Sequence, residues 1–343
     1  MRMRILVVAA AFAVGFVACG GDDGPRSPVN PSPATLRSVS IAGPAEVAPG
    51  TTNQYTATGQ YSDGTTRDLT TSASWNSFTA PLRHVGGGRF LAFEVGDGRV
   101  NVNVPGRSAS FPVIVITPGT FKLSGTIRDA SGTVENVVIE VTSGTGTGLS
   151  TKSTFNGRYA LFGVAGVVGL RASAPGYTTQ ELQVTVDSHG VRDVDISPVS
   201  EPVEVSGNWT LVVTTSSACS DTWPAPARKR EVAATVAQQG TRLSVRFPNA
   251  AISLFRDGNA ARIAGSAFSM TLFYDDYYLD YTLMERISPN EWVGVNGDLT
   301  GTASSTSITG ELVGNFHYYQ SSANFPSGTP RACAADPQFE FRR

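Results

Sequence analysis

Hydrophobic and polar residues alternate in short runs along most of this chain, with turn-forming residues between the runs. In "LRSVSIAG" (residues 36–43) Val39 and Ile41 lie on one face, and in "GRVNVNV" (98–104) valines alternate with asparagines. A period of two predicts half-buried β-strands, and Gly, Asn and Asp between the runs predict tight turns. Apolar residues spaced at three and four do not extend over long stretches. The pattern therefore predicts an all-β protein.

The first predicted unit, residues 35–117, contains several such runs and is expected to form a β-sandwich. Two stretches show the order of its strands and turns: "VAPGTTNQYTATGQYSDGTTRDLTTSASW" (47–75) and the closing "GDGRVNVNV" (96–104). These stretches resemble the bacterial immunoglobulin-like domain of the second group. The resemblance implies a sandwich with Tyr55, Trp75 and the valine ladder in its core, serving as a stalk or an adhesive module.

The second predicted unit, residues 120–198, carries "FKLSGTIRDASG", "TFNGRYAL" and "ASAPGY". These stretches resemble the carboxypeptidase regulatory-like domain, with Gly125 at a matching position and Asn156 where the family usually has Asp. The resemblance implies a small transthyretin-like sandwich of the carbohydrate-binding-like fold. It implies no catalytic zinc, because the zinc of such peptidases lies in another domain. Contact with glycans follows only by analogy of fold.

The third predicted unit, residues 203–343, contains eight or more short strands joined by tight turns. This arrangement predicts an antiparallel up-and-down β-barrel, with a third sandwich as the alternative. Gly207-Asn208-Trp209 in the first strand resembles the start of lipocalins. In that family the tryptophan plugs the closed end of a ligand-binding barrel.

The chain begins with "MRMRILVVAAAFAVGFVAC", in which two arginines precede an apolar run that ends at Cys19. The run is too short to span a bilayer comfortably, so it predicts a signal peptide, residues 1–18. "FVAC" (16–19) resembles the lipobox of bacterial lipoproteins, with Phe16 where Leu is usual. The resemblance implies a lipid on Cys19 and, because Gly20 follows it, retention at the outer membrane of the cell envelope. Ordinary secretion with cleavage after Ala18 is the alternative.

Residues 19–34, which follow the predicted cleavage site, include the proline-rich stretch "PRSPVNPSP". Alternating prolines favour an extended chain of about 3.1 Å per residue, and nothing in this stretch can form a core. We expect a tether that holds the folded units away from the membrane.

The sequence contains three cysteines, and two of them remain if Cys19 is lipidated. In an exported protein Cys219 and Cys333 are expected to form a disulfide. The first and last strands of a barrel are neighbours, so this bond would close the seam of the third unit.

"LFYDDYYLDYTL" (residues 272–283) is the best candidate for a binding surface. Its aspartate pair is expected to turn a hairpin, which brings the tyrosines to one rim near Trp292. Aromatic faces with nearby carboxylates suit sugar rings, although tyrosines are also ordinary half-buried strand residues. The candidate ligand-binding residues are Tyr274, Asp275, Asp276, Tyr277, Tyr278, Tyr281 and Trp292.

With a net charge of −2 over 343 residues, the protein has no excess of positive charge that would attract nucleic acid. His84, His189 and His317 are spread over the three units, and no Gly-x-Ser-x-Gly motif occurs. We therefore expect no nucleophilic triad, no metal site and no cofactor, and predict that the protein is not an enzyme. The candidate alternative, a glycoside hydrolase, would need two carboxylates that converge in one cleft. Carboxylates near the tyrosines are supplied by Asp275, Asp276, Asp280 and Glu285.

These observations predict a lipoprotein that acts in binding or adhesion at the cell envelope. Its ligand would be a carbohydrate or a small apolar molecule, and its lipid anchor would attach it to the membrane. The alternative is a structural spacer or assembly subunit that contacts another envelope protein. A barrel with a filled interior would favour the structural role.

Overall fold

The structure is a computed structural model. It describes residues 33–215, 219, 223–248, 259–272, 283–322, 331–333 and 338–343. Strands dominate the described chain, and α1 (Ala225–Arg228) is a helix of four residues. The predicted all-β class is confirmed. The buried hydrophobic residues form three clusters, one in each of three consecutive units.

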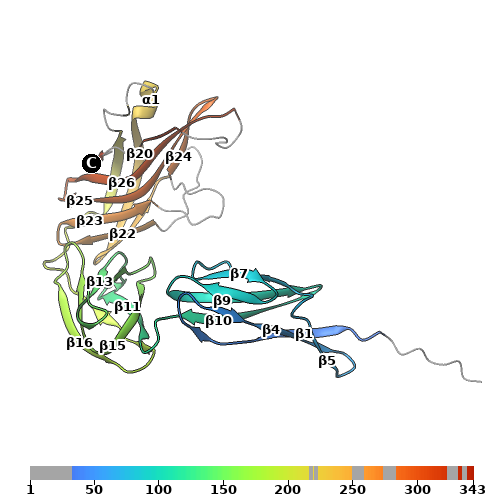
Figure 1. Ribbon diagram of the computed structural model, residues 1–343. Coiled ribbons are helices and arrows are strands. Elements are labelled where there is room, and N and C mark those ends of the chain that lie inside the picture. The colour runs from blue at the N-terminus through green and yellow to red at the C-terminus, as the bar shows by residue number, and fades with distance from the viewer. Residues whose placement is uncertain are drawn as a thin grey trace, which may run out of the picture.

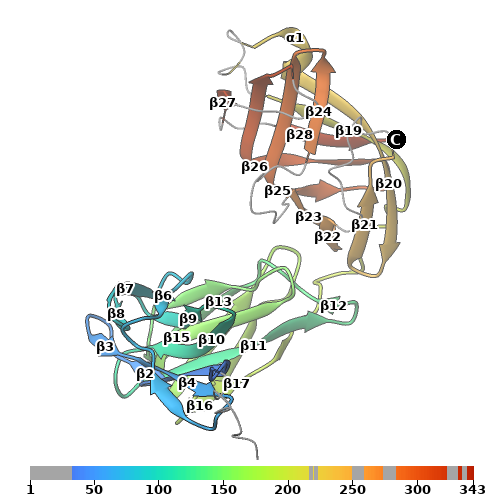
Figure 2. The ribbon, with the colours of Figure 1, turned by 90° about the vertical axis from the view of Figure 1, so that its right-hand side faces the viewer.

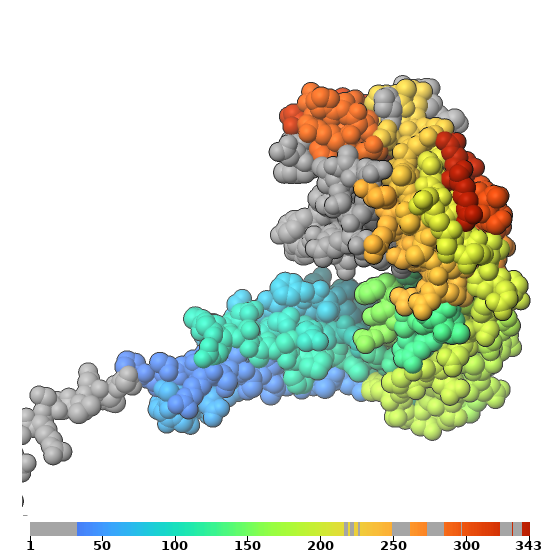
Figure 3. All heavy atoms as spheres, turned by 180° about the vertical axis from the view of Figure 1, so that it is seen from behind, coloured from blue at the N-terminus to red at the C-terminus, as the bar shows by residue number. Residues whose placement is uncertain are grey.

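The three units are arranged around a corner formed by the second one. The first unit extends sideways from the second, and the third stands on the second (Figure 1). A quarter turn shows the third unit in contact with the second at one end (Figure 2). From behind, the first and third units project from the second in different directions (Figure 3).

The first unit contains three sheets, with strand orders β1-β4-β5, β2-β10-β9-β6 and β3-β8-β7. Tyr55 and Trp75, which were expected in the core, are buried and each contacts the ring of Phe90 edge-on. Their polar atoms are satisfied, since the Tyr55 hydroxyl donates to the carbonyl of Pro44 and the Trp75 indole to that of Thr70. The strands are β1 (Leu36–Ala42), β2 (Glu46–Val47), β3 (Thr52–Gln54), β4 (Thr56–Tyr61), β5 (Thr66–Asp68), β6 (Ser74–Asn76), β7 (Leu82–Gly86), β8 (Arg89–Ala92), β9 (Gly96–Val104) and β10 (Arg107–Val115).

The second unit is built around one long strand, β15, which pairs with β11, β13 and β16. Gly125 on β11 has no room for a side chain, because an added Cβ would lie 1.9 Å from the carbonyl oxygen of Arg192. That oxygen also accepts a hydrogen bond from the Tyr159 hydroxyl at 2.6 Å. The strands are β11 (Phe121–Asp129), β12 (Gly132–Thr133), β13 (Val138–Thr145), β14 (Ser150–Lys152), β15 (Arg158–Ser173), β16 (Gln180–Val186), β17 (Gly190–Val191) and β18 (Val194–Asp195).

The third unit is a closed β-barrel of eight strands, as its short strands joined by tight turns predicted. The ring runs β25-β23-β22-β21-β20-β19-β28-β26, and β26 pairs with β25 to close it. β24 (Leu283–Ser288) and β27 (Arg331–Cys333) extend the sheet beyond the ring. The ring strands are β19 (Gly207–Thr214), β20 (Lys229–Gln239), β21 (Arg242–Arg246), β22 (Asn259–Ala264), β23 (Ala267–Leu272), β25 (Glu291–Ala303), β26 (Ser307–Gln320) and β28 (Gln338–Arg342).

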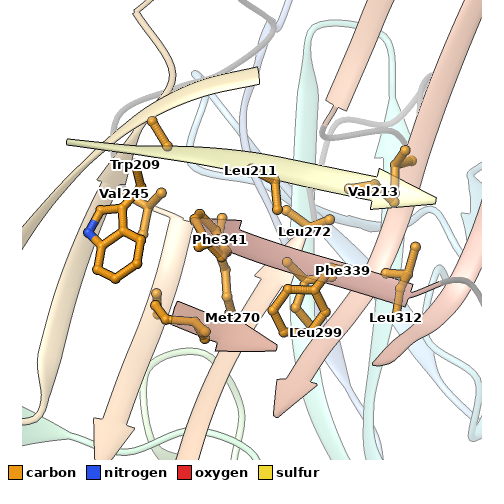
Figure 4. Packing of buried hydrophobic residues seen from close by; sticks show 14 of the residues in the cluster. Trp209, Leu211, Val213, Val245, Met270, Leu272, Leu299, Leu312, Phe339 and Phe341 are labelled. Carbon is orange, nitrogen blue, oxygen red and sulfur yellow. The ribbon is translucent and has the colours of Figure 1, made fainter. Parts of the chain in front are cut away.

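The interior of the barrel is filled by hydrophobic side chains (Figure 4). Phe268, Phe339 and Phe341 contact one another with ring centroids 5.7–6.1 Å apart. Trp209 and Val213 lie toward opposite ends of the labelled core residues in Figure 4. Burial of these side chains provides the main stabilisation of the barrel. Along the described strands the barrel is therefore a packed core, unlike the ligand-binding barrels that its Gly-x-Trp segment resembles.

Candidate functional site

The joint between the second unit and the barrel contains a buried ion pair. Asp129 at the end of β11 and Arg262 on β22 have only 1% and 8% of their side chains exposed. Nη1 of Arg262 lies 3.1 Å from Oδ2 of Asp129 and donates to Oγ1 of Thr241 at 2.9 Å. The other terminal nitrogen of Arg262 donates to the backbone carbonyl of Thr133. One guanidinium thus joins two strands of the second unit to the barrel.

Two hydroxyl groups and the backbone N–H of Ser131 also donate to the Asp129 carboxylate. Thr241 and Tyr177 donate to its Oδ2 at 2.6 and 2.8 Å. Burial and the hydrogen bond to Asp129 raise the pKa of Tyr177 to about 12, so its hydroxyl stays protonated. Separating Asp129 from Arg262 would leave a buried charge without its partner, at a cost of about 3–5 kcal/mol. The network therefore fixes the position of the barrel on the second unit.

A glycine allows β22 to approach the second unit closely. Gly176 has a φ of +77°, and an added Cβ would lie 2.4 Å from the carbonyl oxygen of Ala264. Ala264, at the end of β22, belongs to the buried hydrophobic cluster of the second unit. The barrel and the second unit therefore share a core at this point.

A cavity of about 250 Å³ lies beside this network, between the two units. We call it the joint cleft. The second unit contributes Glu135 and Lys152, and the outer face of the barrel contributes Thr271 on β23 and Asp298 on β25. Oγ1 of Thr271 donates to Oδ1 of Asp298 at 2.8 Å. The other residues that line the joint cleft are Val134, Asn136, Ala174, Pro175, Tyr177, Arg262, Ala267, Phe268, Ser269, Met270, Thr300 and Gly301.

Glu135 is the titratable group most affected by this environment. Burial, together with the negative charge of Asp298, raises the pKa of its carboxyl group to about 7, against the lowering effect of Arg262. Among the described residues no side chain forms an ion pair with Glu135. Its carboxyl group is therefore half protonated near neutral pH.

We expect Glu135→Gln to remove a pH dependence of stability. The pKa is about 7 in the folded protein against an ordinary 4.5. The favourable contribution of Glu135 is thus complete below pH 4.5 and is lost as pH rises to 7, to the extent of about 3 kcal/mol. The urea midpoint of the variant should be higher than that of the wild type at pH 8 and equal to it at pH 4.

Glu181→Gln, on exposed β16, is the matched control and should leave both urea midpoints unchanged. If Glu135→Gln raised the urea midpoint by the same amount at both pH values, the result would contradict the expected titration of Glu135.

The joint between the first and second units uses one partly exposed ion pair and a hydrogen bond of His189 instead. Nζ of Lys122 lies 2.5 Å from Oδ2 of Asp97, and Nε2 of His189 lies 3.2 Å from Oε2 of Glu46. Nδ1 of His189 accepts the backbone N–H of Lys122 at 2.9 Å, so Nε2 carries the proton. Exposed pairs contribute about 0–1 kcal/mol each. Charge interactions therefore hold the first and second units together less firmly than the buried Asp129–Arg262 pair holds the barrel on the second unit.

The predicted binding surface falls largely outside the described residues, which include neither its tyrosines nor its aspartates at positions 274–281. Trp292 is described, and it is fully buried. Its indole N–H donates to the carbonyl of Ser321 at 3.2 Å, and the guanidinium of Arg286 lies 5.4 Å from its ring centre. Trp292 is therefore a core residue, and its expected place on an exposed aromatic surface is wrong. Glu285, one of the carboxylates considered for hydrolysis, forms an ion pair with Arg230.

The two late cysteines belong to neighbouring parts of the barrel. Cys219, between β19 and α1, is buried. Trp223 follows it closely and packs its ring 5.7 Å from that of Phe316, the residue that pairs with Cys333 in the β26–β27 ladder. The side chain of Cys333 is not among those described, so the disulfide stays a prediction. Cys19, the predicted lipid attachment site, lies outside the described residues.

Sequence reasoning did not find Asp129, Glu135 or Arg262. Asp129 lies in the "RDASG" turn of the family stretch, yet Arg262 is 133 positions further along the chain. No local pattern marks such a pair. Asn156, by contrast, was recognised, and its Oδ1 accepts hydrogen bonds from Thr154 and Arg158 as a carboxylate would.

Within the described ranges, no group of three or more His, Cys, Asp and Glu side chains is placed to hold a metal ion. The part of the chain that the structure describes also contains no helix with the length and hydropathy needed to cross a bilayer.

Together these features define an all-β protein of three units whose barrel is docked on a small sandwich. Residues 122–198 match the family model of the carboxypeptidase regulatory-like domain, in agreement with the resemblance of the second unit. The chain is also similar to a solved structure titled "The Bacillus anthracis TIE protein", with 11% identity over 88% of this chain and 72% of that one, and a TM-score of 0.21. No curated protein matches the sequence.

Proposed function

We propose that this protein is a non-enzymatic lipoprotein of the bacterial cell envelope that presents its barrel, in a fixed orientation, to another envelope protein. The observation that carries the proposal is the buried pair of Asp129 and Arg262 with its hydroxyl partners. A flexible linker would suffice for a simple tether. A buried ionic joint is instead suited to hold one unit at a set angle to the next.

The filled barrel interior supports a structural role over storage of a small apolar ligand. Phe268, Phe339 and Phe341 occupy the space that a ligand would need. A carboxypeptidase regulatory-like domain also suits a binding or structural role without catalysis. Carbohydrate binding by residues 272–283 and the hydrolase alternative stay predictions, since the aspartates and tyrosines concerned lie outside the described residues.

The anchor is tested at Cys19. We expect mass spectrometry of the mature protein to find a diacylated or triacylated cysteine at the amino terminus, and the protein to fractionate with membranes. Several acyl chains at about 0.8 kcal/mol per buried methylene make such binding effectively permanent. Cys19→Ser should release the protein into the soluble fraction.

Cys219→Ser is the control, because it removes a cysteine that is not expected to carry lipid. An unmodified amino terminus, or release by both substitutions alike, would contradict the lipoprotein proposal.

A further inference from the structure

The joint cleft is lined by two carboxylates, Glu135 and Asp298, that form no ion pair with another described residue. Arg262 is committed to Asp129, Thr241 and the carbonyl of Thr133. Lys152 lies on the exposed β14 at the edge of the cleft. Among the described residues no lysine or arginine forms an ion pair with Glu135 or Asp298. Apart from Arg262, which is paired with Asp129, the charged groups that line the cleft are thus two carboxylates and the single ammonium of Lys152.

The remainder of the cleft is suited to a short aliphatic body. Ala174, Pro175 and Ala267 supply apolar surface, and Ser269 and Thr271 supply hydroxyl groups. The volume of about 250 Å³ is at the lower end of what small-molecule sites use. Sites between two domains are also a common location for such ligands. The cleft therefore has the size for a few carbon atoms and one polar group.

We propose that the joint cleft binds a free small primary amine, with Glu135 and Asp298 as counter-ions of its ammonium group and Ala174, Pro175 and Ala267 around its alkyl chain. An ammonium has three N–H donors and no acceptor, which matches two carboxylates and a hydroxyl. A divalent metal ion fits less well, because calcium takes six to eight oxygen ligands. The proposal goes beyond the structural role, and the ligand would bind across the joint.

Binding of a cation should depend on pH through Glu135. The charged groups that act on Glu135 are Arg262 on β22 and Asp298 on β25, while Lys152 on β14 and Tyr177 also line the cleft. The raised pKa of Glu135 leaves its carboxyl group largely protonated below pH 6. A bound ammonium favours the carboxylate, so affinity should rise as pH increases through about 7.

The test uses the full chain and n-butylammonium as probe, followed by saturation-transfer NMR and titration at pH 8. We expect it to bind about tenfold more tightly than n-butanol, and n-butyrate not to bind, because opposite charges attract in a partly buried site. Glu135→Gln and Asp298→Asn should each weaken binding about tenfold, and Glu181→Gln should leave it unchanged. Lowering the pH to 5.5 should also weaken binding about tenfold.

Circular dichroism and urea denaturation confirm that each variant is folded before binding is compared. Equal binding of butylammonium and butanol would overturn the proposal, as would unchanged affinity in folded Glu135→Gln. Equal binding of Nα-acetyl-lysine methylamide would identify a lysine side chain of a partner as the ligand and overturn the assignment to a free amine. None of these results depends on the anchor or on the partner of the barrel.

Discussion

Replacing Arg262 by alanine is expected to weaken the joint between the second unit and the barrel by about 3–5 kcal/mol. The substitution leaves the carboxylate of Asp129, only 1% exposed, without its cationic partner. It also removes the hydrogen bonds to Thr241 and to the carbonyl of Thr133. Urea denaturation should show an earlier transition, and small-angle X-ray scattering should show a larger radius of gyration because the barrel moves relative to the second unit.

Arg171→Ala is the matched control for this prediction. Arg171 and Glu140 form an ion pair of 2.5 Å within the second unit, but their side chains are 44% and 35% exposed. Such pairs contribute about 0–1 kcal/mol, so this variant should resemble the wild type in both measurements.

The double substitution Asp129→Asn with Arg262→Met separates the unpaired charge from the loss of contacts. It should be less destabilising than Arg262→Ala alone, because no buried charge is left without a partner. Unchanged scattering and urea midpoint in Arg262→Ala would show that the ionic network does not hold the joint, and would count against the fixed orientation in the proposed function.

Removing the predicted disulfide should have an effect of similar size. In the loop-entropy account, a bond between Cys219 and Cys333 stabilises the barrel by about 4–5 kcal/mol, because it restricts a long loop in the unfolded chain. The pairing of Phe316 with Cys333, and the contact of Phe316 with Trp223, support this connection. Non-reducing peptide mass mapping should find the two peptides linked, and Cys219→Ser should lower the urea midpoint of the barrel.

The control is the double variant Cys219→Ser with Cys333→Ser. A reducing agent should destabilise the wild type to the level of this variant and should have no effect on the variant itself. Free thiols at both positions in protein isolated without reductant would rule the bond out.

Local pattern accounts for much of the fold. Val100 and Val102 alternate with asparagines and are buried on β9, because a strand with one covered face needs only a period of two. The succession of short strands after residue 203 predicted the barrel, with a sandwich as the alternative, because a run of antiparallel strands joined by tight turns can close when its first and last strands pair. The prediction for Trp292 was wrong because β25 is covered on both faces there, with Arg286 over the indole ring. Alternation cannot distinguish such a position from an exposed one.

By itself, the sequence determined the strand content, the order of the three units, the family of the second unit and the barrel, because these depend on the period of apolar residues and on local turns. Only the tertiary structure decided that the barrel interior is packed, that Arg262 meets Asp129, and that Glu135 and Asp298 face one cleft. The physical reason is that these features depend on contacts between side chains far apart in the chain, such as Arg262 with Asp129, which lies 133 positions before it. Such contacts arise from the docking of folded units and leave no periodic signal along the chain.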